Sequence, residues 1–237
     1  MDEGLGLGGR SSGREECDEM GEVKTLPKTN AEKESEVNRV YRILKSWLIE
    51  CELAPGAFLA EVELARRCET SRTPVREACN RLVQDGWIIS LRHRGYQVTP
   101  VSIKELLETY EYRRVLECFA TEKAAQTATS AQLSSLRDIV AVERDSTAEV
   151  GAVIEASDAF HLAIAEIAGN RQVIARLKLT LEYVHRLDRL STQKDRSWIP
   201  HGEILAALEA RRPGEARHAM AVHIDYARDR MLRLFAD

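Results

Sequence analysis

Two arginines stand at the start of a segment whose residue types suit the recognition of base pairs. Arg72 and Arg76 are four positions apart in the octet Ser71–Ala78, so a helix would place both side chains on one face of its first turns. An arginine fork bonds to guanine O6 and N7 together in the major groove. Ser71 and Thr73 suit phosphate oxygens, which the free N–H groups of a helix start also attract. The octet therefore predicts the reading end of a DNA-recognition helix.

The elements around this octet must present it, and their spacing is that of a winged helix-turn-helix. Pro74 falls in the first turn of the octet's helix, where its missing N–H costs nothing, and Ser71 is a suitable N-cap. Arg92, Arg94 and Gly95 belong to the turn of a hairpin, and the two arginines at its tip come within reach of the DNA backbone or minor groove. The apolar patterns predict three helices and then two strands, over 35–50, 61–68, 73–85, 87–90 and 96–99.

The charges of the chain are unevenly distributed. The net charge is -4, yet the stretch from Ala65 to Gly95 holds seven arginines against three acidic residues, a local balance of +4. This argues against indiscriminate nucleic-acid binding and for one local basic face. The alternative is that each arginine is an ordinary surface cation paired with Glu69 or Glu77. The helix-turn-helix spacing and the wing together favour the DNA interpretation.

Three histidines of the second half could carry a different chemistry. His161, His201 and His223 fall on three separate predicted helices, each beside the apolar stripe that faces inward. A single histidine in such a place is more often a hydrogen-bonded core residue than a metal ligand. Three imidazoles that converge inside one bundle predict a divalent transition-metal site, for Zn or Ni rather than Mg. The remaining histidines are expected on the surface: His93, His185 and His218.

A buried cation is the second feature of this region. Arg113 lies on a predicted helix of the same mostly apolar bundle, and an unpaired charge there would be costly. A small carboxylate effector that bridges Arg113 and the metal would supply a partner. The alternative is a structural ion pair with Glu117, four residues further along the helix.

The bundle that would hold these groups is predicted from helical periods alone. Between residues 101 and 237 no segment alternates convincingly like a strand, and six helices are expected at 103–128, 130–144, 150–168, 171–191, 199–210 and 214–235. The fold class is therefore mainly α, with an N-terminal winged helix-turn-helix over 34–100 and a C-terminal all-α helical bundle over 101–237. Residues 1–33 lack an apolar period and are expected to form a disordered tail.

Composition sets the cellular context. The 237 residues suffice for two domains, and 44% hydrophobic with 30% charged residues suits a soluble globular protein. No apolar run approaches the ~18 residues of a transmembrane helix, and the first thirty residues lack the apolar segment of a secretory signal. Five scattered cysteines fit neither a disulfide framework nor a paired zinc motif. We expect a cytoplasmic protein with no membrane partner.

The first half resembles the GntR family of bacterial transcriptional regulators. The resemblance covers about Val40–Val101 and rests on an ordered set of motifs: Leu53-Ala54-Pro55-Gly56, Leu59, Glu61, Leu64-Ala65, the octet Ser71–Ala78, Arg81-Leu82, Gly86 and Arg94-Gly95. It implies that Arg72, Thr73 and Arg76 read bases, that Ser71 contacts phosphate, and that Gly95 lets the wing backbone approach DNA. The chain departs from the family's usual Gly-Val before the serine, where it has Glu69-Thr70.

The second half resembles the FadR-like branch of that family, whose effector domain is a six- or seven-helix bundle of the FCD type. The motifs are Tyr110–Glu117, Phe160-His161 with Ala168-Gly169-Asn170, and the closing histidines His201 and His223. The resemblance implies effector contacts from Arg113 and Asn170. Metal-binding members carry an Asp four residues before the first histidine. Here that residue is Ser157, and Asp158, one position later, is predicted to replace it beside His161, His201 and His223.

Three classes of function fit these features unequally. A ligand-responsive regulator would bind a pseudo-palindromic operator as a homodimer, and a small carboxylate effector would change its operator affinity. A metal-dependent enzyme could use the histidines, but the sequence offers no general base beside them, no phosphate loop and no nucleophile elbow. A structural DNA-binding protein would have an inert helical domain. We expect the regulator, most simply a repressor, and no enzyme.

Overall fold

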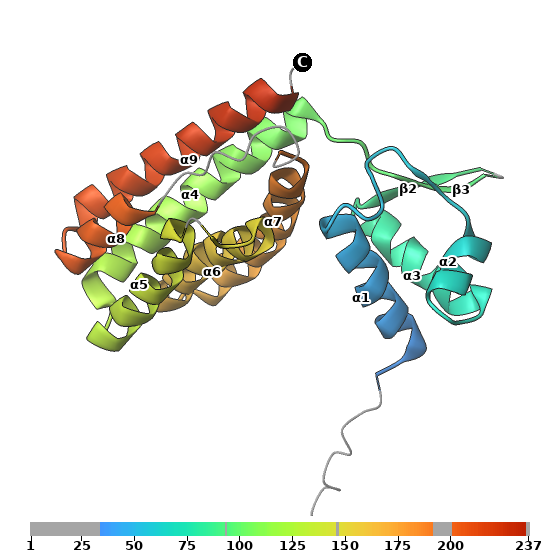
Figure 1. The fold of residues 1–237 in the computed structure, drawn as a ribbon, viewed down its shortest axis with the longest axis horizontal. Coiled ribbons are helices and arrows are strands. Elements are labelled where there is room, and N and C mark those ends of the chain that lie inside the picture. Colours follow the sequence, from blue (N-terminus) through green and yellow to red (C-terminus); the bar gives the residue numbers. More distant parts are fainter. Residues whose placement is uncertain (1–33, 93, 146, 192–200, 236–237) are drawn as a thin grey trace, which may run out of the picture. The chain divides into compact units, whose positions relative to one another are not determined.

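The computed structural model describes residues 34–92, 94–145, 147–191 and 201–235. Within these ranges lie nine helices and one three-stranded sheet (Figure 1). This confirms a mainly α protein with a winged helix-turn-helix followed by a helical bundle. The buried apolar side chains form two separate clusters, one in each half. The predicted tail over 1–33 and His93 lie outside the described residues, and the division of the chain at residue 100 stays a prediction.

The winged helix-turn-helix follows the predicted elements closely. Its members are α1 (Glu36–Ile49), β1 (Phe58–Leu59), α2 (Glu61–Arg67), α3 (Arg72–Gln84), β2 (Ile88–Leu91) and β3 (Gly95–Val98). Helix α1 buries Val40, Leu44 and Leu48, which recur at a helical period and pack with the inward face of α3. Ser71 has the extended backbone of an N-cap, but its side chain makes no cap hydrogen bond and is exposed. Its hydroxyl is therefore not used by the helix.

The sheet contains one strand that the sequence did not reveal. The strand order is β1-β3-β2, and both pairs are antiparallel. Ile88 pairs with Val98 in the predicted hairpin, and Phe58 pairs with Gln97 on the other edge of β3. A strand of two residues is too short to show an alternating period, so β1 was not predictable.

Gly95 opens β3 at a point where only glycine fits. Its φ is +86°, and a Cβ at this position would lie 2.6 Å from the carbonyl oxygen of Leu59 in β1. The missing side chain therefore allows β1 to pair with β3. This gives Gly95 a structural reason in addition to the DNA approach that the family resemblance implies.

Gly95→Ala should accordingly lower the free energy of unfolding by about 1–3 kcal/mol, because the left-handed φ and the collision with Leu59 both oppose a side chain. Urea denaturation monitored by circular dichroism measures this. Gly86→Ala is the matched control, because Gly86 has a φ of +81° but no atom within 4 Å of the added Cβ. It should lose less stability than Gly95→Ala. Equal losses would show that the contact with β1 is irrelevant.

The turn before α3 has a backbone conformation that accounts for the glycine usual in the family, where this chain has Glu69. Glu69 has a φ of +53°, the left-handed region that favours glycine. The family's usual glycine would adopt this backbone without strain. Glu69 adopts the strained conformation in the turn that connects α2 to α3.

The second half is a bundle of six helices within the described ranges. They are α4 (Ile103–Thr127), α5 (Ser130–Arg144), α6 (Val150–Ala168), α7 (Arg171–Ser191), α8 (Gly202–Glu209) and α9 (Pro213–Phe235). Helices α4 and α9 run side by side (Figure 1). Local signals set the helix boundaries: Thr129 and Gln132 form a capping box at α5, and Gly169 ends α6 with a φ of +70°. The bundle positions the histidines on α6, before α8 and on α9.

Candidate DNA-binding surface and histidine centre

The first candidate site is the exposed start of α3. The side chains of Arg72 and Arg76 are 59% and 57% exposed, although each forms an ion pair with Glu61 of α2, at 3.1 and 2.8 Å. The hydrogen bonds from the two arginines hold the pKa of Glu61 low, at about 2. Glu61 thus fixes both guanidinium groups side by side on the α3 face, while their outer edges stay open to solvent.

The two arginines have a different ion-pair partner from the one that the sequence suggested. The expected surface pairing was with Glu69 or Glu77, but the structure pairs them with Glu61 from the preceding helix. Such exposed pairs contribute little to stability, because solvent screens them. The arrangement orients the arginines more than it stabilises the fold, which suits a surface that contacts an outside partner.

The other predicted DNA contacts lie on the surface as well. Ser71 and Thr73 are exposed at the start of α3, and Arg92 and Arg94 are exposed in the turn between β2 and β3. The recognition helix and the wing therefore both present the predicted side chains to solvent. Their contacts with DNA stay predictions.

The second candidate site is a cluster of three imidazoles inside the bundle. His161 of α6, His201 at the N-cap of α8 and His223 of α9 direct their Nε2 atoms at one another. The Nε2 of His201 is 3.0 Å from that of His161 and 3.1 Å from that of His223. The three predicted histidines thus meet, although up to 62 residues separate them along the chain.

Two buried carboxylates orient the cluster from behind. The Nδ1 of His201 is hydrogen-bonded to Glu143 of α5, and the Nδ1 of His161 contacts Glu117 of α4. A carboxylate only accepts, so His201 carries its proton on Nδ1 and donates it to Glu143. A guanidinium only donates, so His161 Nε2, which is 3.2 Å from Arg113 Nη2, is an acceptor. In the neutral rings the Nε2 atoms of His161 and His201 are then bare lone pairs that face each other across 3.0 Å. Two lone pairs at this distance repel unless a cation or a proton lies between them.

The protonation states suit a metal ion. Burial, together with the neighbouring His161, lowers the pKa of His201 well below its usual value, and burial with the neighbouring His201 does the same for His223. Both rings are therefore neutral near pH 7, which is the form that binds metals. A tetrahedral zinc ion with bonds of about 2.0–2.1 Å needs ligand nitrogens about 3.3 Å apart. The two spacings from His201 are within a few tenths of an ångström of this requirement, and all three ligand atoms lie within 4.8 Å of one another.

Arg113 lies next to the same nitrogens. Its side chain is 3% exposed, its Nε donates to Glu117 Oε1 at 2.6 Å, and its Nη2 is 3.2 Å from His161 Nε2. The expected alternative, an ion pair with Glu117, is therefore present. A small cavity of about 30 Å³ adjoins this group and is also lined by Asp158, Asp188 and Arg230. Burial and the nearby Asp158 raise the pKa of Asp188 to about 7.

Comparison with known proteins places both halves in one family. Residues 36–98 match the model of bacterial regulatory proteins of the gntR family, and residues 108–226 match the FCD domain. The HTH-type transcriptional repressor RspR of Escherichia coli K12 is 30% identical over 196 residues, which cover 78% of this chain and 84% of the relative. The chain belongs to the GntR family of bacterial transcriptional regulators.

Two further comparisons give a related transcriptional regulator and a solved structure with a similar fold. The Nta operon transcriptional regulator of Aminobacter aminovorans is 29% identical over 76% of this chain and 87% of its own length. The solved structure of E. coli McbR/YncC matches with a TM-score of 0.68 at 23% identity, over 85% of this chain and 99% of the other. The protein is thus a DNA-binding transcriptional regulator with an FCD domain, and not an enzyme, as the family resemblance implied.

The FCD domain departs from the predicted ligand set at one residue. Asp158 lines the cavity beside His161, but it is not among the groups whose ligand atoms gather with the three histidines. Its carboxylate contacts His185 Nδ1 of α7 at 2.5 Å instead. His185 on the neighbouring helix thus occupies the carboxylate. That Asp158 completes the histidine set stays a prediction.

His185 itself was placed incorrectly by the sequence. It was expected on the surface, but it is 8% exposed, whereas His218 is exposed as expected. Burial alone would lower the pKa of His185, yet the hydrogen bond to Asp158 and the charges of Asp158 and Glu50 raise it above its usual value. A histidine on a mostly polar stretch of α7 gave no sequence signal of these two partners.

Asn170, predicted to contact an effector, has a local structural role. Its side-chain oxygen accepts the backbone N–H groups of Gln172 at 3.0 Å and of Val173 at 3.3 Å, so it caps the start of α7. It does not line the cavity beside the histidines.

Among the described residues, no helix combines the length and the apolar character that crossing a membrane requires.

Proposed function

We propose that this GntR protein is an operator-binding repressor whose DNA affinity is set by a small carboxylate bound beside a divalent metal in the FCD domain. The observation that carries the proposal is the histidine centre, where two buried imidazoles and one half-buried imidazole meet beside a buried arginine. Two of the relatives are described as repressors, RspR and a probable D-xylose utilization operon repressor. These names support repression rather than activation for this protein.

The metal would be held by His161, His201 and His223. Imidazole ligands favour Zn or Ni over Mg, and Glu117 and Glu143 would keep two of the rings oriented. When bound, the metal supplies a fixed positive charge with open coordination positions for an anionic ligand. Ser157 offers no carboxylate at the position where the family resemblance implies an aspartate, so the protein would leave more of the coordination shell to exogenous ligands.

The effector would be anionic because of the charges around the cavity. A metal at the histidines would lie close to the Arg113 guanidinium, whose Nη2 is only 3.2 Å from His161 Nε2. Two cations this close repel, and a carboxylate between them would relieve the repulsion. Arg230 lines the same cavity from α9. The cavity of about 30 Å³ has room for little more than a water molecule, so an effector must move side chains as it enters.

The homodimer would form through the outer faces of α4 and α9. These adjacent helices expose large apolar side chains over a common region, which solvent-exposed helices seldom do without a partner. The exposed fractions range from 45% to 70% for Val115, Phe119, Val222 and Tyr226. A two-fold axis through this surface would pair each patch with its copy. The two recognition helices would then read two half-sites.

Val115→Asp should therefore convert the dimer to a monomer in the micromolar range, because the charge is introduced twice across a two-fold interface. Sedimentation equilibrium measures the shift in mass. Val62→Asp is the control, because Val62 is 63% exposed but lies on α2, away from the patch. A Val115→Asp protein that remains dimeric would place the interface elsewhere.

The proposed function is tested by selecting genomic DNA fragments with the purified protein. A short inverted repeat should be enriched, and Ni²⁺ or Zn²⁺ with a panel of small carboxylic acids should change the affinity for it. Absence of any enriched sequence, with and without metal, would contradict operator binding. An enriched operator whose affinity no acid changes would leave a DNA-binding protein without this class of effector.

A further inference from the structure

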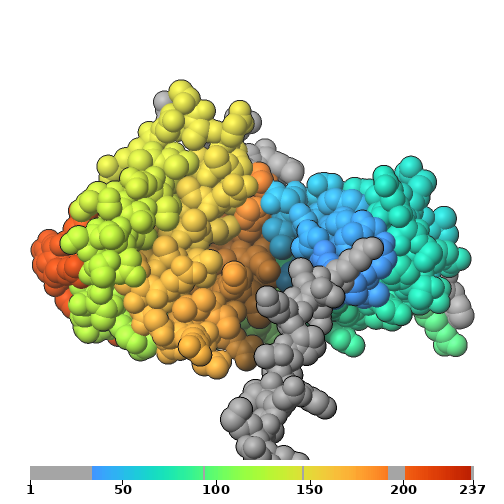
Figure 2. Space-filling view, turned by 90° about the horizontal axis from the view of Figure 1, so that it is seen from below, coloured from blue at the N-terminus to red at the C-terminus, as the bar shows by residue number. Residues whose placement is uncertain are grey.

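Helix α7 touches the histidine cavity and the DNA-binding half with different residues. Val184 and Asp188 line the cavity beside the histidines. Glu182, His185 and Arg189 contact α1, which belongs to the winged helix-turn-helix. In the space-filling view the orange surface of α7 adjoins the blue surface of α1 (Figure 2). Helix α7 alone therefore connects the side chains of the cavity to the DNA-binding elements.

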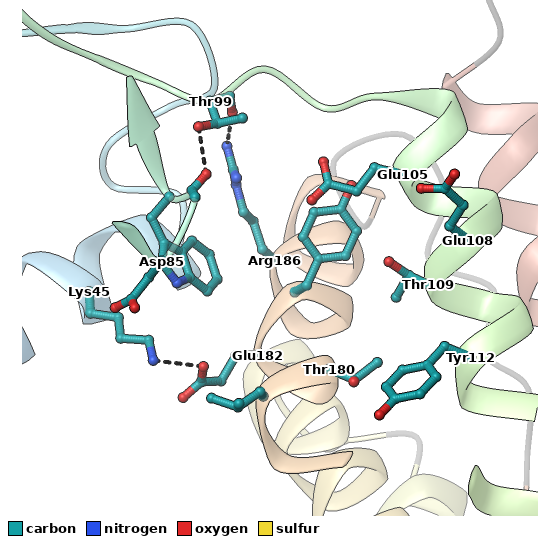
Figure 3. Close-up of a pocket in the computed structure, with 14 residues that line it drawn as sticks. Lys45, Asp85, Thr99, Glu105, Glu108, Thr109, Tyr112, Thr180, Glu182 and Arg186 are labelled. Atoms are coloured by element: carbon teal, nitrogen blue, oxygen red, sulfur yellow. Dashed lines mark hydrogen bonds and ion pairs between the residues drawn. The ribbon is translucent and has the colours of Figure 1, made fainter. Parts of the chain in front are cut away.

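The contacts from α7 to the DNA-binding half are polar and few. Glu182 pairs with Lys45 at 2.8 Å, and Arg186 donates to the backbone oxygen of Thr99 at 2.6 Å (Figure 3). A cavity of about 550 Å³ lies among these side chains and is lined from α1, α4, α7 and the segment from Asp85 to Trp87. The two polar contacts join the halves at the edge of this cavity. Such bonds can be broken one at a time.

His185 is the residue that belongs to both sides of this connection. Its Nδ1 is 2.5 Å from Asp158 Oδ2, and Asp158 lines the histidine cavity. Its Nε2 is 3.0 Å from Glu50 Oε1, and the other Glu50 oxygen is 2.6 Å from Arg189. Glu50 is the C-cap of α1. One imidazole therefore links a carboxylate of the cavity to the end of a DNA-domain helix.

We propose that His185 is a positioning residue that couples the histidine cavity to the DNA-binding half, through a hydrogen bond to Asp158 at one ring nitrogen and an ion-pair contact with Glu50 at the other. The two carboxylates contact the same ring, so a change in the position of Asp158 alters the orientation of the imidazole that faces Glu50. An occupant of the cavity can compete with His185 for Asp158, whereas Glu117 is buried in contacts with Arg113 and His161. This inference rests on the proposed effector control, since it names the route by which the cavity acts on α1.

The decisive experiment follows hydrogen exchange at the end of α1 in the metal-free full-length protein. Asp158→Ala should speed amide exchange over residues 46–53 by about three- to tenfold, because His185 loses one of the two carboxylates that fix it against Glu50. Glu155→Ala is the matched control, since Glu155 is an exposed acidic residue one turn earlier on α6. Exchange over Leu133–Leu136 of α5 serves as the internal reference for general loss of stability. Asp158→Asn replaces the alanine variant if that variant does not fold.

The double variant separates coupling from coincidence. In a His185→Ala background, Asp158→Ala should add no further acceleration at α1, because the link is already broken. An unchanged rate at α1 in Asp158→Ala, or the same acceleration in both backgrounds, would overturn the proposal. The readout involves neither DNA, metal nor effector. Its failure would therefore leave the proposed function intact, and failure of the operator selection would not affect it.

A selected operator extends the test to DNA affinity. Fluorescence anisotropy should show that Asp158→Ala changes the operator Kd by about threefold or more. The change in Kd should vanish in a Glu50→Gln background, because Glu50 is the residue at the end of α1 that His185 contacts. Equal changes in both backgrounds would mean that Asp158 acts by a route that bypasses His185 and Glu50.

Discussion

The Arg72→Ala/Arg76→Ala double variant should lose operator affinity by about 10²-fold or more. Each arginine that bonds to a guanine edge contributes ~1–3 kcal/mol of discrimination, and the two act at adjacent positions of one helix. Glu61 holds both guanidinium groups at ion-pair distance in the free protein, so little side-chain freedom has to be lost when DNA binds. The affinity loss should be largest for the selected operator and smaller for unrelated DNA.

Anisotropy titrations with the operator and with a scrambled duplex measure both effects. Arg212→Ala is the control, because Arg212 is an exposed arginine that pairs with Glu215 at the start of α9, outside the DNA-binding half. It should bind like the wild type. Unaltered operator binding by the double variant would show that α3 is not the recognition helix. A loss that is equal for operator and scrambled DNA would assign the arginines to phosphate contacts.

The DNA-binding half was largely predictable from the sequence because its signals are local. Pro74 and the Ser71 N-cap mark the start of α3, and the alternating segments mark the hairpin. The role of Glu61 was not predictable, because α2 and α3 bring it to Arg76 across fifteen positions. Local periodicity predicts the helices and strands. It does not predict which side chains of two helices form ion pairs once the turn between them has set their orientation.

The histidine cluster was predictable for a different reason. Each histidine lies beside an inward-facing apolar stripe, so helices that bury their stripes must bring the three rings into the core. Their convergence is therefore a consequence of amphipathic patterning. The orientation of each ring is not, because it depends on Glu117 and Glu143, which approach from α4 and α5. The sequence suggested Glu117 only as a partner for Arg113, and it gave no signal for Glu143.

The contact between Asp158 and His185 was missed by sequence reasoning. Asp158 shares the side of the helix that carries His161, and both line one cavity. The presence of His185 on α7 decides which way the carboxylate points. A ligand set therefore depends on which neighbouring helix offers the better partner, and that requires the packed structure.

His161→Ala should empty the metal site if the three histidines form one. Removal of one of three imidazoles leaves two, and Glu117 and Arg113 lose the ring that they contact. The wild type, loaded with Ni²⁺ or Zn²⁺ and desalted, should retain about one ion per chain, because three protein ligands make a closed set with an exogenous ligand. The metal should also stabilise the wild type by about 2.7 kcal/mol at a concentration 100 times its Kd, and should not stabilise the variant.

Metal analysis by mass spectrometry and thermal denaturation with and without metal measure these effects. His218→Ala is the control, because His218 is exposed and lies on α9 with His223. Glu143→Gln should weaken metal binding about 10–100-fold, since Glu143 orients His201 without being a ligand. Equal metal content in the wild type and His161→Ala would rule out this centre. A full effect of His161→Ala with none from Glu143→Gln would mean that His201 needs no carboxylate to hold its ring in place.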